Sequence, residues 1–424
     1  MTTTKQGVRR VRFGMIGCGE VGQGVLTLLA AQAADLAERF GVAFEPVVVA
    51  VRNLDRDRGS HVQGIDFVTD PLLVVHDPRV ELVVEVAGGL AMGPALEAAL
   101  TARKPVVTAN KALVAAQLGE LIALSRSTGT PIGCEAAVAA ALPILRSLGR
   151  RVDRVQRLLA IVNGTSNFVL TRMEQDELEL PRAVAMAQKL GLAEADPAAD
   201  IDGHDAAAKL SILAHRSLGI WAKPGSFPVM GIRDLLPADF DLADAMGHRI
   251  RHIAHAELLN DGVRLGVEPL LLPNWHLLAG VEEEYNAVYL CCKFAGDLSF
   301  FGKGAGGLPT ATAVVGDMVD LALGTSSFWP AAVPAQLLDP ALCDRRHYLR
   351  VTAHRHTGLA RRIEGLLRKA GHTVQDRATC VGKKDSIHLG FLLAPCSDVR
   401  LAPVRELLLE LGRVRAVLTL GITE

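Results

Sequence analysis

The chain has 424 residues, of which 50% are hydrophobic and 21% are charged, with a formal net charge of −1. This length exceeds one ordinary hydrophobic core and predicts two or three domains. The near-zero charge gives no reason to expect nucleic acid or a membrane as a partner. We see no signal peptide and no apolar run near the roughly 20 residues of a membrane helix. Seven scattered cysteines favour reduced thiols over a disulfide framework or a zinc site, which indicates a cytoplasmic protein.

The first third alternates short apolar, β-branched runs with segments of helical spacing. This alternation predicts right-handed crossovers and a Rossmann-type parallel sheet, which we assign to residues 1–145. The expected strands are Val11–Ile16, Pro46–Val51, Leu82–Val86 and Pro105–Thr108, and the expected helices are Gly22–Arg39 and Pro94–Ala102.

The pattern changes near Ile144, and residues 146–328 are expected to form a second domain of the α+β class. Its last helix, near 309–324, is expected to pack back on the first domain. Expected strands are Arg154–Asn163, Val263–Leu272 and Ala287–Phe294, and expected helices are Ser166–Met173, Arg182–Leu190 and Asp205–Ile220.

The final part of the chain begins with a proline-rich stretch at Trp329–Pro340, so residues 329–345 are expected to be a linker. Residues 346–424 then have a βαββαβ pattern, which predicts a ferredoxin-like domain. The expected elements are strand His347–Ala353, helix Gly358–Lys369, strands His372–Cys380 and Ile387–Leu393, helix Val399–Leu411 and strand Arg415–Leu420.

A glycine-rich loop, Gly17-Cys18-Gly19-Glu20-Val21-Gly22, follows the first expected strand and opens a helix. In this setting G-x-G-x-x-G indicates a dinucleotide site, because the glycines permit a tight turn and close approach of a pyrophosphate. A turn without a ligand is the alternative. Arg52, at the end of the second strand, is compatible with the 2′-phosphate of NADP or with a solvated arginine beside NAD, so the sequence leaves the cofactor open.

A group of charged residues stands out in the second domain. Asp205 and Lys209 lie four residues apart on an expected helix, so they share one face and can pair. The loop before that helix holds Glu194, Asp196, Asp200 and Asp202, and so many acids beside a lysine suit a zwitterionic substrate. An exposed salt bridge, a solvated loop and a calcium site are the alternatives, although the spacing lacks the regular ladder of an EF-hand.

Several segments together resemble homoserine dehydrogenase, from about Val11 to Gly324. They are VVTANK at 106–111, NGTSN at 163–167, GLAEADPAADIDGHDAAAKL at 191–210 and GAGGLPTA at 304–311. The C-terminal unit resembles the ACT domain of long-form members. This resemblance implies NAD(P)H-dependent, reversible reduction of L-aspartate 4-semialdehyde to L-homoserine, in threonine and methionine biosynthesis.

The resemblance also implies roles for single residues. Lys209 and Lys111 would be catalytic, with Asp205 orienting Lys209, while Glu194, Asp200, Gly164 and Thr165 would bind substrate. The cofactor would lie against Gly17, Gly19, Glu20, Val21, Gly22, Arg52, Thr108, Asn110, Lys111 and Gly306. A homodimer or homotetramer is expected.

Two segments depart from the family pattern. Where the family has a glycine-rich turn, this chain has Ala139-Ala140-Ala141, so a backbone angle that only glycine adopts freely would be strained. Related enzymes bind Na⁺ or K⁺ there, which implicates Glu135 and the carbonyls of Val138, Ala140 and Leu142. The ACT-like turn reads RHTG at 355–358 and lacks the usual acid and proline, so a threonine-type effector and a purely assembling domain both stay open.

Two other functions remain as alternatives. One is a Rossmann dehydrogenase for a different amino-acid semialdehyde, with the altered turn changing specificity. The other is a non-catalytic nicotinamide or amino-acid sensor, which Lys111, Asp205 and Lys209 argue against, because a sensor has little need of both lysines.

Overall fold

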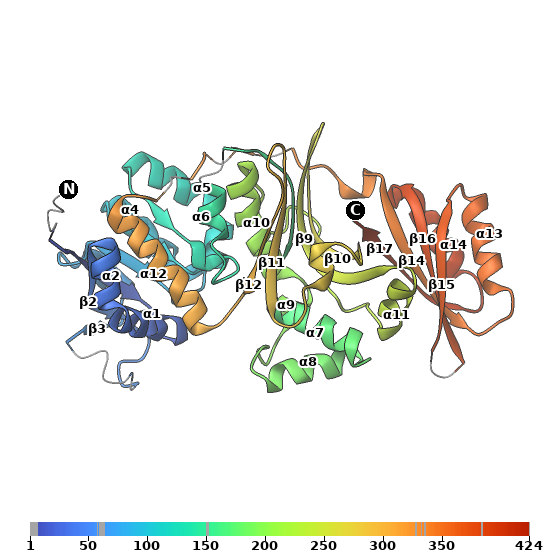
Figure 1. Ribbon diagram of the computed structural model, residues 1–424, viewed down its shortest axis with the longest axis horizontal. Coiled ribbons are helices and arrows are strands. Elements are labelled where there is room, and N and C mark those ends of the chain that lie inside the picture. The colour runs from blue at the N-terminus through green and yellow to red at the C-terminus, as the bar shows by residue number, and fades with distance from the viewer. Residues whose placement is uncertain are drawn as a thin grey trace.

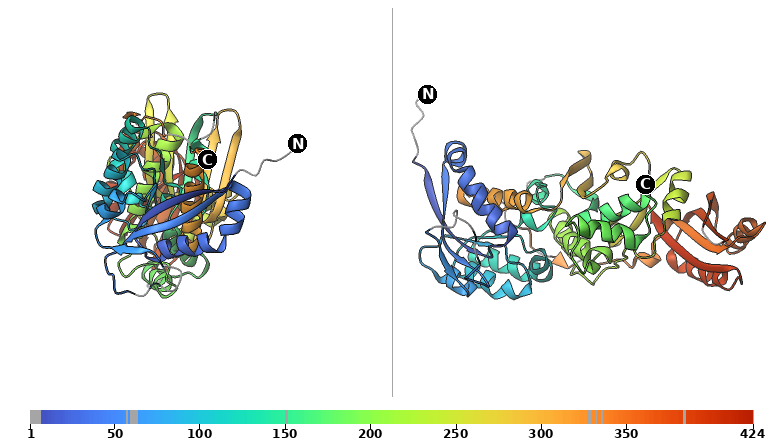
Figure 2. Two further views of the ribbon diagram at one scale, coloured as in Figure 1. Left: turned by 90° about the vertical axis from the view of Figure 1, so that its left-hand side faces the viewer. Right: turned by 90° about the horizontal axis from the view of Figure 1, so that it is seen from below.

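The computed structural model describes residues 7–56, 58, 64–149, 152–326, 329–331, 333–334, 336–382 and 385–423. Three parts lie in a row along the long axis: an N-terminal α/β part, a central mixed sheet, and a C-terminal unit (Figure 1). The view from below shows the same order (Figure 2). None of the helices in the described ranges has the length and apolar character needed to cross a bilayer.

The N-terminal part has the predicted parallel sheet. Within the described ranges it has six strands in the order β3-β2-β1-β4-β5-β6, all paired in parallel, which is the order of a dinucleotide-binding fold. The strands are β1 (Arg9–Ile16), β2 (Val42–Ala50), β3 (Asp66–Val68), β4 (Leu82–Glu85), β5 (Val106–Thr108) and β6 (Ile132–Gly133). The helices are α1 (Glu20–Ala31), α2 (Ala33–Phe40), α3 (Pro71–His76), α4 (Gly93–Thr101) and α5 (Lys111–Thr128).

The prediction of one helix over Gly22–Arg39 is wrong, because the chain breaks at Gln32, where φ is −106° and ψ is 10°. The break lets the two halves pack on different neighbours. α1 lies against α12 (Gly307–Leu323), whereas α2 packs on β2. Side chains of α12 such as Val314 and Met318 join the same core as Val25 of α1, so a segment distant in sequence completes the N-terminal part.

The central sheet continues without interruption into the C-terminal unit. Its order is β12-β11-β7-β9-β10-β17-β14-β16-β15 within the described residues. The central strands are β7 (Val155–Ile161), β9 (His248–Leu259), β10 (Gly262–Pro273), β11 (Tyr285–Cys292) and β12 (Gly296–Lys303). The sequence analysis identified β7, β10 and β11 but neither β9 nor β12. The remaining elements here are α6 (Ile144–Gly149), α7 (Gly164–Gln175), α8 (Leu180–Lys189), α9 (Ala198–Ile201), α10 (His204–Leu218), β8 (Ile220–Trp221) and α11 (Pro237–Ala245).

The C-terminal unit has the predicted βαββαβ order, with the sheet order β17-β14-β16-β15. Its elements are β14 (Arg345–His354), α13 (Leu359–Lys369), β15 (Val374–Val381), β16 (Ser386–Cys396), α14 (Asp398–Leu409) and β17 (Val414–Ile422). The unit joins the central sheet where β17 pairs in parallel with β10, at Leu270–Gly421 and Leu271–Ile422.

The segment expected to be a linker is more ordered than its composition suggests. Trp329 is buried, and β13 (Val333–Pro334) pairs with β8. Residues 332 and 335 of this segment lie outside the described residues. The domain boundaries themselves stay predictions.

A buried ion pair adds a second connection between the central part and the C-terminal unit. Asp239 of α11 pairs with Arg350 of β14 and accepts a hydrogen bond of 2.8 Å from the Tyr348 hydroxyl. Arg350 also donates to the carbonyl of Asp234 at 3.2 Å. Both charges are almost fully buried, so each depends on the other for compensation.

The turn that precedes α6 contains two alanines in the left-handed backbone region. Ala139 has a φ of 53° and Ala140 a φ of 42°, and both side chains are buried. An L-residue in the left-handed region costs about 1–2 kcal/mol, so the alanines strain this turn. The sequence analysis predicted such strain wherever the turn needs a backbone angle that only glycine adopts freely.

We predict that Arg350→Met lowers the free energy of unfolding by about 3–5 kcal/mol, because it leaves the Asp239 carboxylate buried without an opposite charge. Urea unfolding followed by circular dichroism measures the change. The double variant Arg350→Met with Asp239→Asn should recover part of the loss, since it removes the unpaired charge. Equal stability of the single variant and the parent would contradict this prediction.

We also predict that Ala140→Gly stabilises the protein by about 0.5–1 kcal/mol. The strain energy that glycine relieves in the folded state exceeds the free energy by which its added chain entropy stabilises the unfolded state. Thermal unfolding measures the shift in Tm. Ala141→Gly, at the exposed neighbour whose φ is not positive, is the matched control and should be slightly destabilising. A lower Tm for Ala140→Gly would show that the turn is not strained at this position.

Candidate active site

One buried carboxylate, that of Asp205, pairs with two lysines that come from different parts of the chain. Lys209 Nζ lies 2.7 Å from Asp205 Oδ2, one helical turn away on α10. Lys111 Nζ, from the first residue of α5, lies 2.5 Å from Asp205 Oδ1. Lys209 also donates to the carbonyl of Val162 at 2.6 Å, just after β7. The structure therefore brings together Lys111, Asp205 and Lys209; the Asp205–Lys209 pair was predicted from the sequence, whereas the contact between Lys111 and Asp205 was not.

The local charges set the protonation of this group. Burial alone would raise the pKa of Asp205, but the two ammonium groups outweigh it and hold the pKa below its usual range. Burial lowers the pKa of Lys209. Burial also favours a lower pKa for Lys111. The negative charges of Asp205, Asp200 and Glu194 outweigh burial, so the pKa of Lys111 is raised. The more buried lysine therefore gives up its proton more readily than the outer one.

Asn163 connects the acid-rich loop to this centre, which the sequence analysis did not anticipate. Its amide nitrogen donates to Asp200 at 2.6 Å and to Asp205 at 2.8 Å. Its amide oxygen accepts from Ser166 N at 2.7 Å and caps the N-terminus of α7. The cap thereby places Gly164 and Thr165 in the first turn of α7, beside the carboxylates.

The acids of the preceding loop divide into two groups. Asp200 is partly buried, and burial raises its pKa. Glu194 is exposed, and Thr165 ties the same loop to α7 by donating to the carbonyl of Leu192 at 2.6 Å. The charges of Asp200 and Glu194 act on Lys111, so these two acids face the site. Asp202 instead pairs with Arg233, and Asp196 accepts from Ala198 N.

The glycine-rich loop borders a groove of about 750 Å³. Gly17 has a φ of 99°, and a Cβ there would lie 2.6 Å from Ala87 N. A Cβ on Gly22 would lie 2.6 Å from the carbonyl oxygen of Gly17, whereas Gly19 faces open space. The loop is thus tight where it packs and open where a pyrophosphate would approach, so it fits a dinucleotide.

Three arginines line the same groove at the end of β2: Arg52, Arg56 and Arg58. Only Arg52 was singled out from the sequence. Arg58 is held by the carbonyls of Asn53 and Arg56, at 2.5 and 2.7 Å, and by the Phe67 ring. This wall of the groove therefore carries positive charge.

A buried carboxylate that the sequence analysis missed braces the opposite wall. Glu85, at the end of β4, accepts from the backbone N–H groups of Ala87 and Gly88 and from the Thr108 hydroxyl at 2.6 Å. Asn110 donates to the carbonyl of Gly89 at 2.8 Å and caps α5. The side chains of Thr108 and Asn110 thus hold the loop that lines the groove and set where α5, with Lys111, begins.

The start of α12 contacts the glycine-rich loop. The Glu20 carboxylate accepts from Gly307 N at 3.0 Å, which joins α1 to the start of α12. Gly306, at the N-cap of α12, has a φ of 115°. Val21 lies beside Glu20 in α1, so the predicted residues Glu20, Val21 and Gly306 are neighbours.

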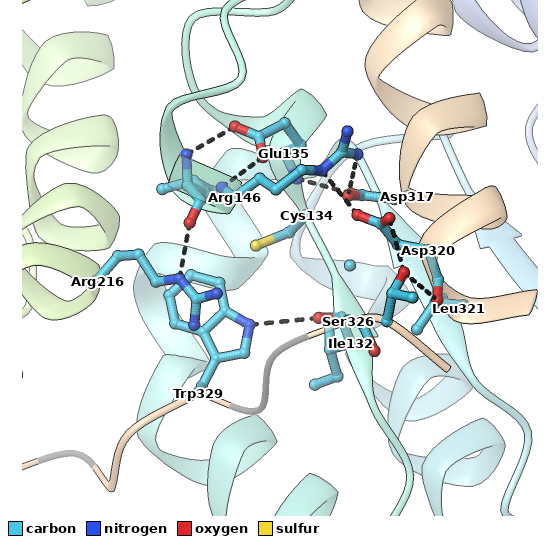
Figure 3. Close-up of a pocket in the computed structure, with 13 residues that line it drawn as sticks. Ile132, Cys134, Glu135, Arg146, Arg216, Asp317, Asp320, Leu321, Ser326 and Trp329 are labelled. Carbon is cyan, nitrogen blue, oxygen red and sulfur yellow. Dashed lines mark hydrogen bonds and ion pairs between the residues drawn. The ribbon is translucent and has the colours of Figure 1, made fainter. Parts of the chain in front are cut away.

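Glu135 lies in a separate, small cavity of about 40 Å³ between α6 and α12 (Figure 3). Its two oxygens accept from Leu145 N and Arg146 N, each at 2.7 Å, so it caps α6. Its own N–H donates to Asp317, whose pKa burial and the Glu135 charge raise to about 7. Among the described residues, no three His, Cys, Asp or Glu side chains converge as metal ligands.

Comparisons with known proteins agree with this geometry. The family model for the NAD-binding domain of homoserine dehydrogenase matches residues 17–135, and the model for homoserine dehydrogenase matches residues 143–319. A homoserine dehydrogenase from Pseudomonas aeruginosa is 35% identical over 384 residues, which cover 87% of this chain and 88% of that protein.

Solved structures give the same result. A homoserine dehydrogenase from Thiobacillus denitrificans aligns with a TM-score of 0.91 and 32% identity over 99% of both chains. A hyperthermophilic archaeal homoserine dehydrogenase in complex with NADPH aligns with a TM-score of 0.65 and 26% identity, over 76% of this chain and all of that one. The chain belongs to the homoserine dehydrogenase family of NAD(P)-dependent oxidoreductases.

Proposed function

We propose that Lys209 is the proton donor in the reversible reduction of L-aspartate 4-semialdehyde to L-homoserine, with Lys111 assisting and Asp205 orienting both lysines. The observation that carries this proposal is the buried Asp205 carboxylate, which pairs with a lysine from each of two domains. A non-catalytic sensor has no need of this arrangement, because neither cofactor nor amino-acid binding requires two lysines on one acid.

The chemistry follows from where charge develops. When bound, the reduced nicotinamide supplies hydride to the aldehyde carbon, and negative charge then grows on the aldehyde oxygen. A positioned cation and proton donor lower this barrier. Burial depresses the pKa of Lys209, which makes it the better donor. Lys111 keeps its charge beside Asp205 and stabilises the oxygen electrostatically.

The substrate ammonium group would bind between Asp200 and Glu194. Asp200 is linked through Asn163 to Asp205, so recognition of the ammonium and placement of Lys209 share one hydrogen-bonded unit. Gly164 and Thr165, in the first turn of α7, place helix N–H groups where a substrate carboxylate is favoured. A zwitterion with a short side chain fits these charges.

We predict that Lys209→Ala lowers kcat by at least about a thousandfold, because the variant loses both a proton donor and the positive charge that stabilises the aldehyde oxygen. The Kd for the cofactor should change little. Steady-state assays with aspartate 4-semialdehyde and fluorescence titration with NADPH give the two quantities. Lys189→Ala, at the end of α8, is the matched surface control. Near-normal turnover of Lys209→Ala would refute the assignment.

The cofactor is NADP(H) in this proposal. The support is the positive wall formed by Arg52, Arg56 and Arg58 where the adenosine ribose of a bound dinucleotide would lie. Guanidinium groups are suited to hold a 2′-phosphate, whereas an acidic side chain would accept from the 2′-hydroxyl of NAD.

We predict that Arg52→Gln raises the KM for NADPH about tenfold, equivalent to about 1.4 kcal/mol, and leaves the KM for NADH within twofold. Comparison of kcat/KM for the two cofactors tests this. Arg39→Gln, which removes an exposed ion pair on α2, is the control. An equal change for both cofactors would indicate a general effect on the groove and would contradict NADP recognition.

A monovalent cation, Na⁺ or K⁺, would bind at the Ala139–Ala140 turn in this proposal. The ligands would be Glu135 and the carbonyls of Val138, Ala140 and Leu142. Glu135 is fixed by two backbone N–H groups and each oxygen keeps a lone pair, and Ala139 and Ala140 of the turn have left-handed backbone angles. Activity in NaCl and KCl, compared with choline chloride, tests the requirement.

Assembly and regulation belong to the same proposal. Tyr285 stacks on the exposed ring of Phe301, and both lie on the sheet face that carries the core around Leu159 and Tyr289. This aromatic pair supports a homodimer, or a homotetramer built from it, through that face.

At the ACT-like unit, Gly358 caps α13 but Arg355–Thr357 offers no acid for an effector ammonium. Light scattering and calorimetric titration of threonine distinguish an effector site from assembly alone. A cytoplasmic role in threonine and methionine biosynthesis completes the proposal.

A further inference from the structure

Trp329 follows α12 and is buried, with 5% of its surface exposed. Its indole lies over the Arg216 guanidinium at 4.6 Å and is stacked on the His215 ring at 5.7 Å. The indole N–H donates to the carbonyl of Ile132, in β6, at 3.3 Å. Figure 3 shows the indole between the Arg216 side chain and this carbonyl. One side chain thus contacts both the N-terminal sheet and α10.

The backbone around Trp329 is also held. The Arg126 guanidinium, from α5, donates to the carbonyl of Trp329 at 3.2 Å. His215 Nε2 lies 3.2 Å from the carbonyl of Pro330. Burial lowers the pKa of His215 to about 4, so the ring is neutral near pH 7 and Nε2 carries the proton that it donates. The segment is therefore tied to both α5 and α10.

These contacts lie at the ends of two helices that carry the lysines at their beginnings. α5 begins at Lys111, is kinked at Gln117, where φ is −122° and ψ is 20°, and reaches Arg126 in its last turn. α10 carries Asp205 and Lys209 in its first turns and His215 and Arg216 in its last. Between these ends the two helices pack through one hydrophobic core, which includes Leu118 and Ile122 of α5 and Leu210 and Leu213 of α10. The shared core on the C-terminal side of the kink therefore couples the last turns of α5 and α10 to each other.

We propose that Trp329 is a positioning residue for catalysis, because it ties the far ends of α5 and α10 and so fixes where Lys111 and Lys209 meet on Asp205. The inference rests on the catalytic roles proposed above. Cavities of about 40 and 390 Å³ are both lined by Trp329 and Arg216. Truncation of the indole would connect these two cavities and let the end of α10 shift. A displacement of about 1 Å at reacting groups can cost a hundredfold in rate.

The experiment compares Trp329→Ala, Trp329→Phe and Trp275→Ala. Trp329→Ala should lower kcat at least tenfold and shift the kcat–pH profile, because the pKa of Lys209 depends on its distances to Lys111 and Asp205. The Kd for NADPH should change less than threefold. Trp329→Phe keeps an aromatic ring on Arg216 and should restore most of kcat and the parental pH profile. Trp275, which is exposed, controls for the loss of a tryptophan.

If Trp329→Ala does not fold, Arg126→Met is the second variant, since it removes an exposed side chain and only the bond to the Trp329 carbonyl. It should lower kcat twofold to fivefold with the same direction of pH shift. A folded Trp329→Ala, or failing that Arg126→Met, with parental kcat and pH profile would overturn the inference. Failure of the proposed function is seen separately, as retained turnover in Lys209→Ala.

Discussion

The site depends on one electrostatic constraint, the buried Asp205 carboxylate shared by Lys111 and Lys209. A buried carboxylate is costly unless it is compensated, and two ammonium groups compensate it here. The same contact joins α5 of the N-terminal part to α10 of the central part. The arrangement of the two parts and the protonation of the lysines are therefore set together. Asn163 extends the constraint to Asp200, so the acid that we propose to bind the substrate ammonium is fixed by the same group.

The N-terminal part is arranged to present its cofactor groove to this centre. Glu85 holds the loop after β4 and, through Thr108, the strand that leads to Lys111. Glu20 joins the glycine-rich loop to the start of α12. The buried Glu85 accepts from two backbone N–H groups and one hydroxyl, and the exposed Glu20 accepts from one backbone N–H, so both carboxylates help to hold their loops in place. The groove and the lysines consequently form one site, although they arise from segments nearly 200 residues apart in sequence.

The C-terminal unit is connected to the catalytic part more firmly than a tethered domain would be. Its edge strand β17 continues the central sheet beside β10, and the Asp239–Arg350 pair crosses the junction from α11. The segment before α11 contacts α9, because Ile232 N donates to the carbonyl of Ile201, next to Asp200. Packed and hydrogen-bonded residues thus connect the C-terminal unit with the segment that carries Asp200.

The sequence alone determined the local elements and the chemistry they carry. Periodicity predicted the parallel sheet and the βαββαβ unit, and the four-residue spacing of Asp205 and Lys209 placed both on one face of α10. These features depend on neighbours within a few residues.

Only the tertiary structure decided which distant residues meet. It brought Lys111 to Asp205, used Asn163 and Glu85 as braces, placed Trp329 at the ends of α5 and α10, and merged the last unit into the central sheet. The strand β9 was missed because its Arg and His residues interrupt the continuous apolar run that burial on both sheet faces normally produces. Such contacts arise from packing between segments far apart in the chain, and no local pattern encodes them.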